Sequence, residues 1–108
     1  MTIQFNTDKN INGNAAFTAP HIAQIKDGFS RCSHLITRIE VHLSDEDGNK
    51  NSLNAMDCMI EARLEGRQPI VVNNQADKNN QAINGAIDKL AASLVTIVGK
   101  HSMQGSEQ

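Results

Sequence analysis

The residues of this sequence whose types could support catalysis or metal binding are four histidines, two cysteines and one acidic segment. The histidines stand far apart, at His21, His34, His42 and His101. No two of them have metal-ligand spacing, and none accompanies a serine or cysteine in a recognisable nucleophile pattern. Cys32 and Cys58 form no CxxC motif or zinc-type cluster. We therefore expect surface histidines and two reduced, buried cysteines.

Acidic residues gather at Asp45–Asp47, which invites comparison with a calcium-binding loop. The EF-hand pattern would require glycine at Lys50 and a carboxylate at Met56, so the pattern is broken twice. A short acidic segment with glycine and asparagine is typical of a solvated hairpin loop. The sequence therefore predicts no metal site.

Motifs of nucleotide-binding enzymes are also missing. The segment Gly99–His101 lacks the preceding glycine of a phosphate-binding loop, and no dinucleotide-binding fingerprint occurs. A two-layer domain of 108 residues leaves little volume for a convergent polar pocket. We therefore expect a protein that is not an enzyme, with no cofactor and no small-molecule substrate.

Composition sets further bounds. The chain has 108 residues and 39% hydrophobic content, enough for one compact domain. Three Phe and no Trp or Tyr leave the core to aliphatic side chains and provide few platforms on which unpaired bases could stack. The net charge of −2 argues against nucleic-acid binding through net charge alone, but a local basic stripe is compatible with it. No run of about 18 apolar residues occurs, so we expect a cytoplasmic protein without membrane contact.

Hydrophobic periodicity predicts the elements in the first half of the chain. Alternation predicts strands at Thr2–Asn6 and, most clearly, at Arg38–Ser44. Between them, apolar residues at three-and-four spacing predict a helix over Thr18–Ser33, with Pro20 in its first turn and Ile36 at the end of its apolar stripe.

The second half is predicted in the same way. Alternation indicates a third strand at Cys58–Glu65, and a short fourth strand follows at Ile70–Asn73. The last helix is predicted over residues 78–98, beginning at Lys78 or one residue earlier, with Gly99 as its stop signal.

The order β-α-β-β-β-α predicts an α+β fold of two layers. A four-stranded sheet would carry two helices on one face, as double-stranded-RNA-binding domains do. We expect a single domain over residues 1–101 and a flexible C-terminal tail over residues 102–108.

Three stretches of the sequence follow the order and spacing of a known family: TRIEVHLSDEDG at Thr37–Gly48, EARLEGRQPI at Glu61–Ile70 and AINGAIDKL at Ala82–Leu90. Over about Ile3 to His101, the sequence resembles the short form of the ribosome hibernation-promoting factor, or ribosome-associated inhibitor (protein Y), family. The resemblance implies a translation inhibitor of stress or stationary phase. Its partner would be the small ribosomal subunit with its rRNA, and it would lodge in the decoding channel.

The resemblance also implies that basic side chains of the helical layer contact RNA phosphates. Carried onto this sequence, it gives four RNA-binding candidates: Arg31, Lys78, Lys89 and Lys100. Lys89 and Lys100 match the basic flank of the last helix in the family, whereas Ser93 and Thr96 provide no charge there. Asn80 stands where the family usually carries an aromatic residue.

These departures keep an alternative open: a diverged family member that acts as a protein-interaction or regulatory module with weak or no RNA binding. Its candidate surface is the outward face of the sheet. There Arg38 and Arg63 are expected to pair with glutamates across adjacent strands, and His42 would lie among them. The sequence leaves the state of homo-oligomerisation open.

Overall fold

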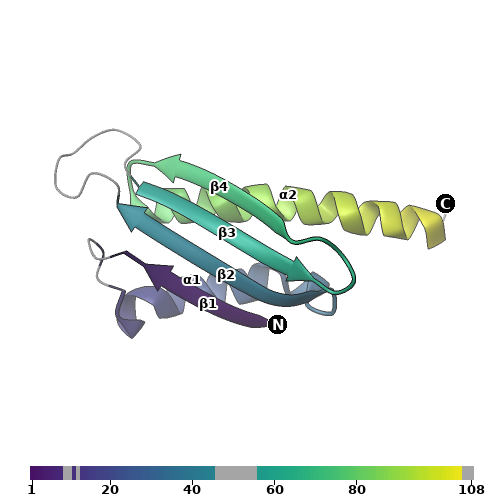
Figure 1. Cartoon of the computed structure of the whole chain (residues 1–108), viewed down its shortest axis with the longest axis horizontal. Coiled ribbons are helices and arrows are strands. Elements are labelled where there is room, and N and C mark those ends of the chain that lie inside the picture. Colours follow the sequence, from purple (N-terminus) through teal and green to yellow (C-terminus); the bar gives the residue numbers. More distant parts are fainter. Residues whose placement is uncertain (9–10, 12, 46–55, 106–108) are drawn as a thin grey trace.

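The protein is a mixed four-stranded sheet with two helices on one face (Figure 1). The computed structural model describes residues 1–8, 11, 13–45 and 56–105, with residues 98–105 described by their backbone alone. The elements in chain order are β1 (Thr2–Thr7), α1 (Ala15–Gly28), the 3-10 helix η1 (Ser30–Cys32), β2 (Ile36–Asp45), β3 (Met56–Leu64), β4 (Ile70–Ala76) and α2 (Asn79–Gly105). The predicted α+β fold with the order β-α-β-β-β-α is confirmed.

The strands lie in the sheet in the same order as in the chain, so β1 and β4 form its two edges. The first strand, β1, pairs parallel with β2 after a crossover through α1, whereas the β2–β3 and β3–β4 pairs are antiparallel. The polar hairpin loop predicted between β2 and β3 lies almost wholly in residues 46–55, outside the described residues.

One aliphatic core lies between the sheet and the helices. The inward residues of the central strands are buried, as their alternation predicts: Ile39, Val41, Leu43, Cys58, Ile60 and Ala62. The helix α2 covers β3 and β4 with one buried stripe: Ala82, Ile83, Ala86, Leu90 and Leu94. From the α1 side, Ile25 and Phe29 complete the core. Burial of these side chains holds both helices on the same face.

The two cysteines are free, and their environments differ. Cys58 is fully buried on β3, and burial is the main cause that raises the pKa of its thiol to about 12. Cys32 is only half-buried, because it lies in η1, after the end of α1. The prediction that both cysteines are buried is therefore wrong for Cys32.

The first helix begins and ends earlier than the sequence predicts. Asn14 caps it, since its side-chain oxygen accepts the backbone N–H of Phe17 at 2.9 Å. Pro20 consequently lies beyond the first turn, and α1 ends at Gly28. Ile36, predicted as the end of the helical stripe, is instead the first residue of β2.

The last two elements are both longer than predicted. Asparagines favour turns, yet β4 continues through Asn73 and Asn74 to Ala76. The reason is that Nδ2 of Asn74 donates to the backbone oxygens of Gln81 and Ala82 in α2, at 3.3 and 3.2 Å. Helix α2 also continues through Gly99, so the predicted stop is wrong. The boundary between a domain of residues 1–101 and a tail of residues 102–108 stays a prediction.

Candidate nucleic-acid interface

The sheet has an uncovered face, here called the open face, to which alternate side chains of each strand point. On β2 and β3 its members are Arg38, Glu40, His42, Ser44, Asp57, Met59, Glu61 and Arg63. All of them are half-buried or exposed, whereas their neighbours in the chain on β2 and β3 are buried, apart from the strand ends. The sheet therefore has one dry face, under the helices, and one wet face.

Like charges stand opposite each other on the open face. Arg38 is in register with Arg63, and Glu40 with Glu61. Each arginine instead pairs along its own strand: Nε of Arg38 lies 2.7 Å from Oε2 of Glu40, and Nε of Arg63 lies 3.5 Å from Oε2 of Glu61. The prediction of salt bridges across adjacent strands is therefore wrong, because the register places both arginines in one row and both glutamates in the next.

Glu40 is the centre of this network. Its partner Arg38 also donates to the side-chain oxygen of Gln4 on β1, and Nε2 of His42 lies 3.6 Å from Oε1 of Glu40. The hydrogen bond from Arg38 is the largest effect on Glu40 and lowers the pKa of its carboxyl, against the opposing effect of burial. The charges of the open face thus neutralise one another, which makes it a poor platform for phosphates.

The four RNA-binding candidates lie in the helical layer. Arg31 is exposed in η1, Lys78 is exposed directly before α2, and Lys89 is exposed on α2. Nζ of Lys89 donates to the backbone oxygen of Asn73 on β4 at 2.8 Å, so this ammonium group is held beside the outer strand. The position of Lys100 belongs to α2, but its side chain is outside the described residues.

Lys89 and Lys100 follow one line along α2, because they are eleven positions apart and about eleven residues complete three helical turns. Lys78 stands eleven positions before Lys89, directly before the first residue of the helix, and its backbone oxygen accepts the N–H of Ala82. At the helical rise, neighbouring positions are about 16 Å apart. Arg31 follows α1 and does not belong to this line. The fold therefore arranges the lysine positions as a row and leaves Arg31 apart from it.

Asp88 stands beside this row in the sequence, since it directly precedes Lys89, and it is exposed. Asp27 is exposed at the end of the other helix, α1. The salt bridges between described residues all lie on the open face, so the described ammonium groups of Lys78 and Lys89 are available to an external anion.

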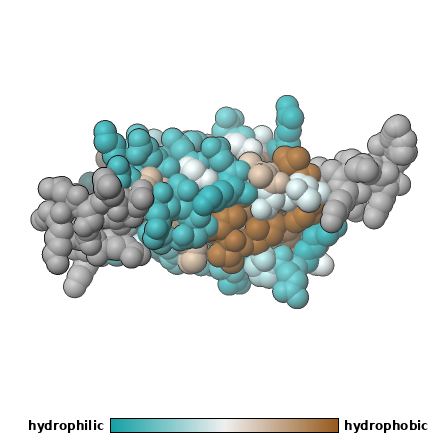
Figure 2. Space-filling view, turned by 90° about the horizontal axis from the view of Figure 1, so that it is seen from above, coloured by the Kyte–Doolittle hydropathy of each residue, from teal (hydrophilic) through white to brown (hydrophobic). Residues whose placement is uncertain are grey.

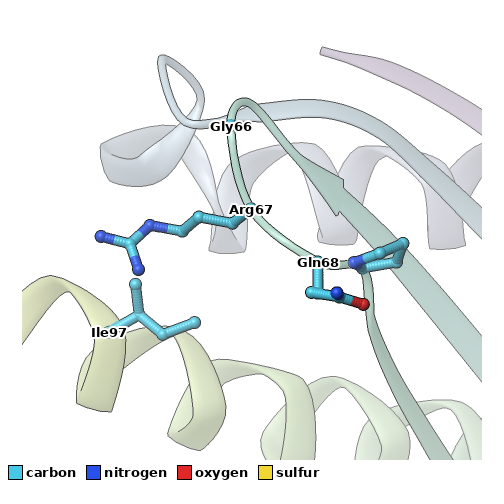
Figure 3. A pocket seen from close by; sticks show the side chains of 5 residues that line it. Gly66, Arg67, Gln68 and Ile97 are labelled. Atoms are coloured by element: carbon cyan, nitrogen blue, oxygen red, sulfur yellow. The ribbon is translucent and has the colours of Figure 1, made fainter.

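Arg67 is a further cation, which is not among the four candidates predicted from the sequence. It lies in the β3–β4 turn, where Gly66 adopts a φ of 73°, a conformation that favours glycine. In Figure 3 its side chain extends over Ile97 of α2, and these two residues line an open hollow of about 730 Å³ together with Gly66, Gln68 and Pro69. Glycine and proline are typical of a turn, but only the fold shows which helix this turn approaches.

The histidines do not assemble a metal site in the part of the chain that the structure describes. No group of three or more His, Cys, Asp or Glu side chains there could hold a metal ion. His21 is half-buried rather than a surface side chain: it stacks on Phe5 and meets the edge of Phe17, and burial lowers its pKa. Across the same residues, no helix has the length and apolar character needed to cross a membrane.

Solved structures share this fold, and two of them are described below. One is the N-terminal domain of Thermus thermophilus Protein Y, with a TM-score of 0.65 and 17% sequence identity, covering 90% of this chain and 99% of that chain. The other is a ribosomal subunit interface protein from Coxiella burnetii, with a TM-score of 0.63 and 17% identity, covering 92% of this chain and 99% of that chain. No curated protein matches the sequence significantly.

The sequence itself matches a family model described as "Sigma 54 modulation protein / S30EA ribosomal protein" over residues 8–102. This match includes all three stretches on which the resemblance rests, and it spans every element from α1 to β4 and most of α2. The chain belongs to the sigma 54 modulation protein / S30EA ribosomal protein family, in agreement with the kinship predicted from its sequence.

Proposed function

We propose that this protein is a ribosome-associated hibernation factor that binds the small ribosomal subunit in its decoding channel under stress or in stationary phase. The observation that carries the proposal is membership of the S30EA ribosomal protein family over residues 8–102. The two similar structures, described as a Protein Y domain and a ribosomal subunit interface protein, support it. The protein would act in the cytoplasm by occupying the channel, not as an enzyme.

The contacts would be made by Arg31, Lys78, Lys89 and Lys100 to rRNA phosphates. Because the net charge of the chain is −2, affinity has to come from a local row of cations, as along α2. The bond of Lys89 to Asn73 reduces the freedom of the lysine side chain before RNA binds. Phosphate contacts release counterions, so binding should weaken steeply as salt rises.

Co-sedimentation with purified small subunits over a range of salt concentrations tests the proposal. We expect Lys78→Glu and Lys89→Glu to weaken binding and to reduce the salt slope by about one for each phosphate that is no longer neutralised. Lys26→Glu is the matched control, because Lys26 is an exposed lysine of α1 outside the row and the charge change is the same. Absence of co-sedimentation at low salt, or an equal effect of all three variants, would contradict the proposal.

A second candidate function, a protein-interaction module that does not need RNA, is favoured by the internally paired charges of the open face. Arg63 is more exposed than its partner Glu61 and is therefore the more accessible residue. A partner captured from stationary-phase lysate after nuclease treatment, and no longer captured by the Arg63→Glu variant, would support this function. Release of every partner on nuclease treatment would exclude it.

A further inference from the structure

The outer side of β4 is an unpaired edge of the sheet, since no further strand of the described chain lies beside it. The strand has 7 residues, IVVNNQA, without a charged side chain or a proline. Natural edge strands are commonly protected by lysine, proline, bulges or a covering element, because an unpaired edge can template another strand. Apart from Lys89, which reaches the Asn73 oxygen from α2, the strand has none of these protections, and such an edge is suited to strand addition.

The backbone groups directed away from β3 can be assigned from hydrogen bonds. The backbone oxygen of Asn73 accepts Nζ of Lys89 from outside the sheet. On β2, the backbone oxygens of Val41 and Leu43 accept bonds from the β1 side. Because backbone groups alternate in direction along a strand, the register then shows which residues of β3 point to β4 and which residues of β4 point back to β3. The outward donors and acceptors of β4 therefore belong to Val71, Asn73 and Gln75.

Cations line this edge along its length. Arg67 precedes the strand, Lys89 reaches its centre, and Lys78 follows its end. Two carboxylates also border it: Asp57 accepts Nδ2 of Asn73 on the open face, and Asp77 lies between β4 and Lys78. Arg67 and Lys89 thus provide two cations on the helix side of the edge, whereas Asp57 lies on the opposite side.

Apolar surface accompanies these charges. Figure 2, which views the molecule from the side of β4, shows a continuous brown area. Val71 is 56% exposed on the open face of β4, and Ile97 forms the apolar wall of the hollow on the helix side. In that hollow the guanidinium group of Arg67 lies next to Ile97 (Figure 3). A glutamate fits this pair, because its methylene groups can cover Ile97 while its carboxylate meets Arg67.

We propose that the outer edge of β4 binds an extended peptide segment of a partner protein as a fifth strand, and that this segment alternates acidic with aliphatic residues. Side chains of a strand point alternately to its two sides. The acidic side chains would meet Arg67 and Lys89 on the helix side, and the aliphatic ones would cover Val71 on the open face. Main-chain hydrogen bonds to β4 provide affinity, and the two rows of side chains provide selectivity.

Other occupants fit this edge less well. A second copy that paired its own β4 around Asn73 would bring two Lys89 ammonium groups together, which is unfavourable. A nucleic-acid backbone presents phosphate acceptors, whereas the edge offers alternating donors and acceptors together with an exposed valine. A peptide strand matches both the backbone pattern and the apolar surface.

Titration of the full-length 15N-labelled protein with a peptide of alternating Glu and Val, as long as β4, tests the inference. We expect the largest amide shift changes at Val71, Asn73 and Gln75, whose N–H groups point outward. The same peptide with Lys in place of Glu should bind at least about tenfold more weakly, because it meets Arg67 and Lys89 with like charge.

Two variants test the edge without touching the ladder between β3 and β4. Gln75→Pro removes one outward N–H and should weaken binding of the Glu/Val peptide about tenfold. Arg67→Glu lies in the turn outside the strand, so this variant tests the proposal even if the proline disturbs β4. It should weaken binding of the Glu/Val peptide by a similar factor. Lys26→Glu on α1 is the control of equal charge change and should leave peptide affinity unchanged. None of these positions is an RNA-binding candidate, so the outcome is separate from that of ribosome binding.

Four results would overturn the inference: unperturbed β4 amides, equal binding of the Glu/Val and Lys/Val peptides, displacement of the peptide by oligouridine from the same amides, or concentration-dependent self-association through β4. The third would assign the edge to nucleic acid, and the fourth would assign it to a second copy of the chain.

Discussion

On β3, Ile60 and Glu61 are neighbours in the chain but lie on opposite faces of the sheet. Ile60 is fully buried under α2, whereas Glu61 forms a salt bridge with a half-exposed arginine on the open face. The covered face is held by burial of aliphatic surface, and the open face is organised by charges that water screens. The comparison teaches that apolar packing and charge pairing are assigned to different sides of the same strands.

The largest loss of stability is expected for a substitution on the covered face. Ile60→Ala should lower the free energy of unfolding by about 3 kcal/mol, because it leaves a cavity in the core. Glu61→Ala, one residue away, should change it by no more than about 0.5 kcal/mol. Urea unfolding monitored by circular dichroism measures both, and comparable losses would contradict the division between the faces.

A smaller loss of stability is expected at the contact between Gly85 of α2 and Asn74 of β4. A Cβ atom at Gly85 would overlap the amide group of Asn74 and displace it from its bonds to the helix backbone. Gly85→Ala should therefore destabilise the protein by about 1–2 kcal/mol, although alanine favours the helix. Gly28→Ala in α1 is the control, since nothing lies within 4 Å of its added Cβ. A stabilised Gly85→Ala protein in thermal unfolding would show that the covering helix has room to shift.

The N-terminal cap of α1 should contribute a smaller stabilisation than the contact at Gly85. Asn14→Ala removes the acceptor for the N–H of Phe17 and should cost about 1 kcal/mol, whereas Asn14→Ser should keep most of the stability. Chemical unfolding of the two variants makes the comparison. Equal stabilities would mean that α1 is held by its contacts with the core alone.

The smallest effect belongs to the open face and appears as a dependence on pH. The pKa of Glu40 is lowered from its ordinary value of 4.5, chiefly by Arg38, so the ionised pair stabilises the folded state above that value. This contribution should disappear as the pH falls through the lowered pKa. Glu40→Gln and Arg38→Gln should each flatten the acid limb of the unfolding free energy measured against pH. If both variants kept the acid dependence of the original protein, the Arg38–Glu40 pair would not contribute to the loss of stability at low pH.

Much of the fold could be predicted because burial imposes a simple period on the sequence. Alternation identifies β2 and β3, and the apolar stripe identifies α2. One error lies where a contact between distant segments outweighs local preference: Asn74 is held in β4 by carbonyl groups of α2. Another is the predicted stop at Gly99, since the helix continues past it.

The candidate interface was predictable to a lesser degree. Exposure of Arg31, Lys78 and Lys89 follows from their positions outside the apolar stripes. The contact of Lys89 with Asn73, and the approach of Arg67 to Ile97, depend on how β4 lies against α2. No spacing within one element encodes such a contact, so the placement of these two cations on the helix side of the β4 edge became visible only in the folded protein.

The parallel pairing of β1 has a consequence for folding and local opening. Strands β2, β3 and β4 follow one another as an antiparallel meander, whereas β1 meets β2 only after the chain has closed a long loop through α1. Contacts between distant segments form late, because their loop-closure entropy must be offset first. The N-terminal strand should therefore dock last and detach first, and its amide hydrogens should exchange with water before those of β3.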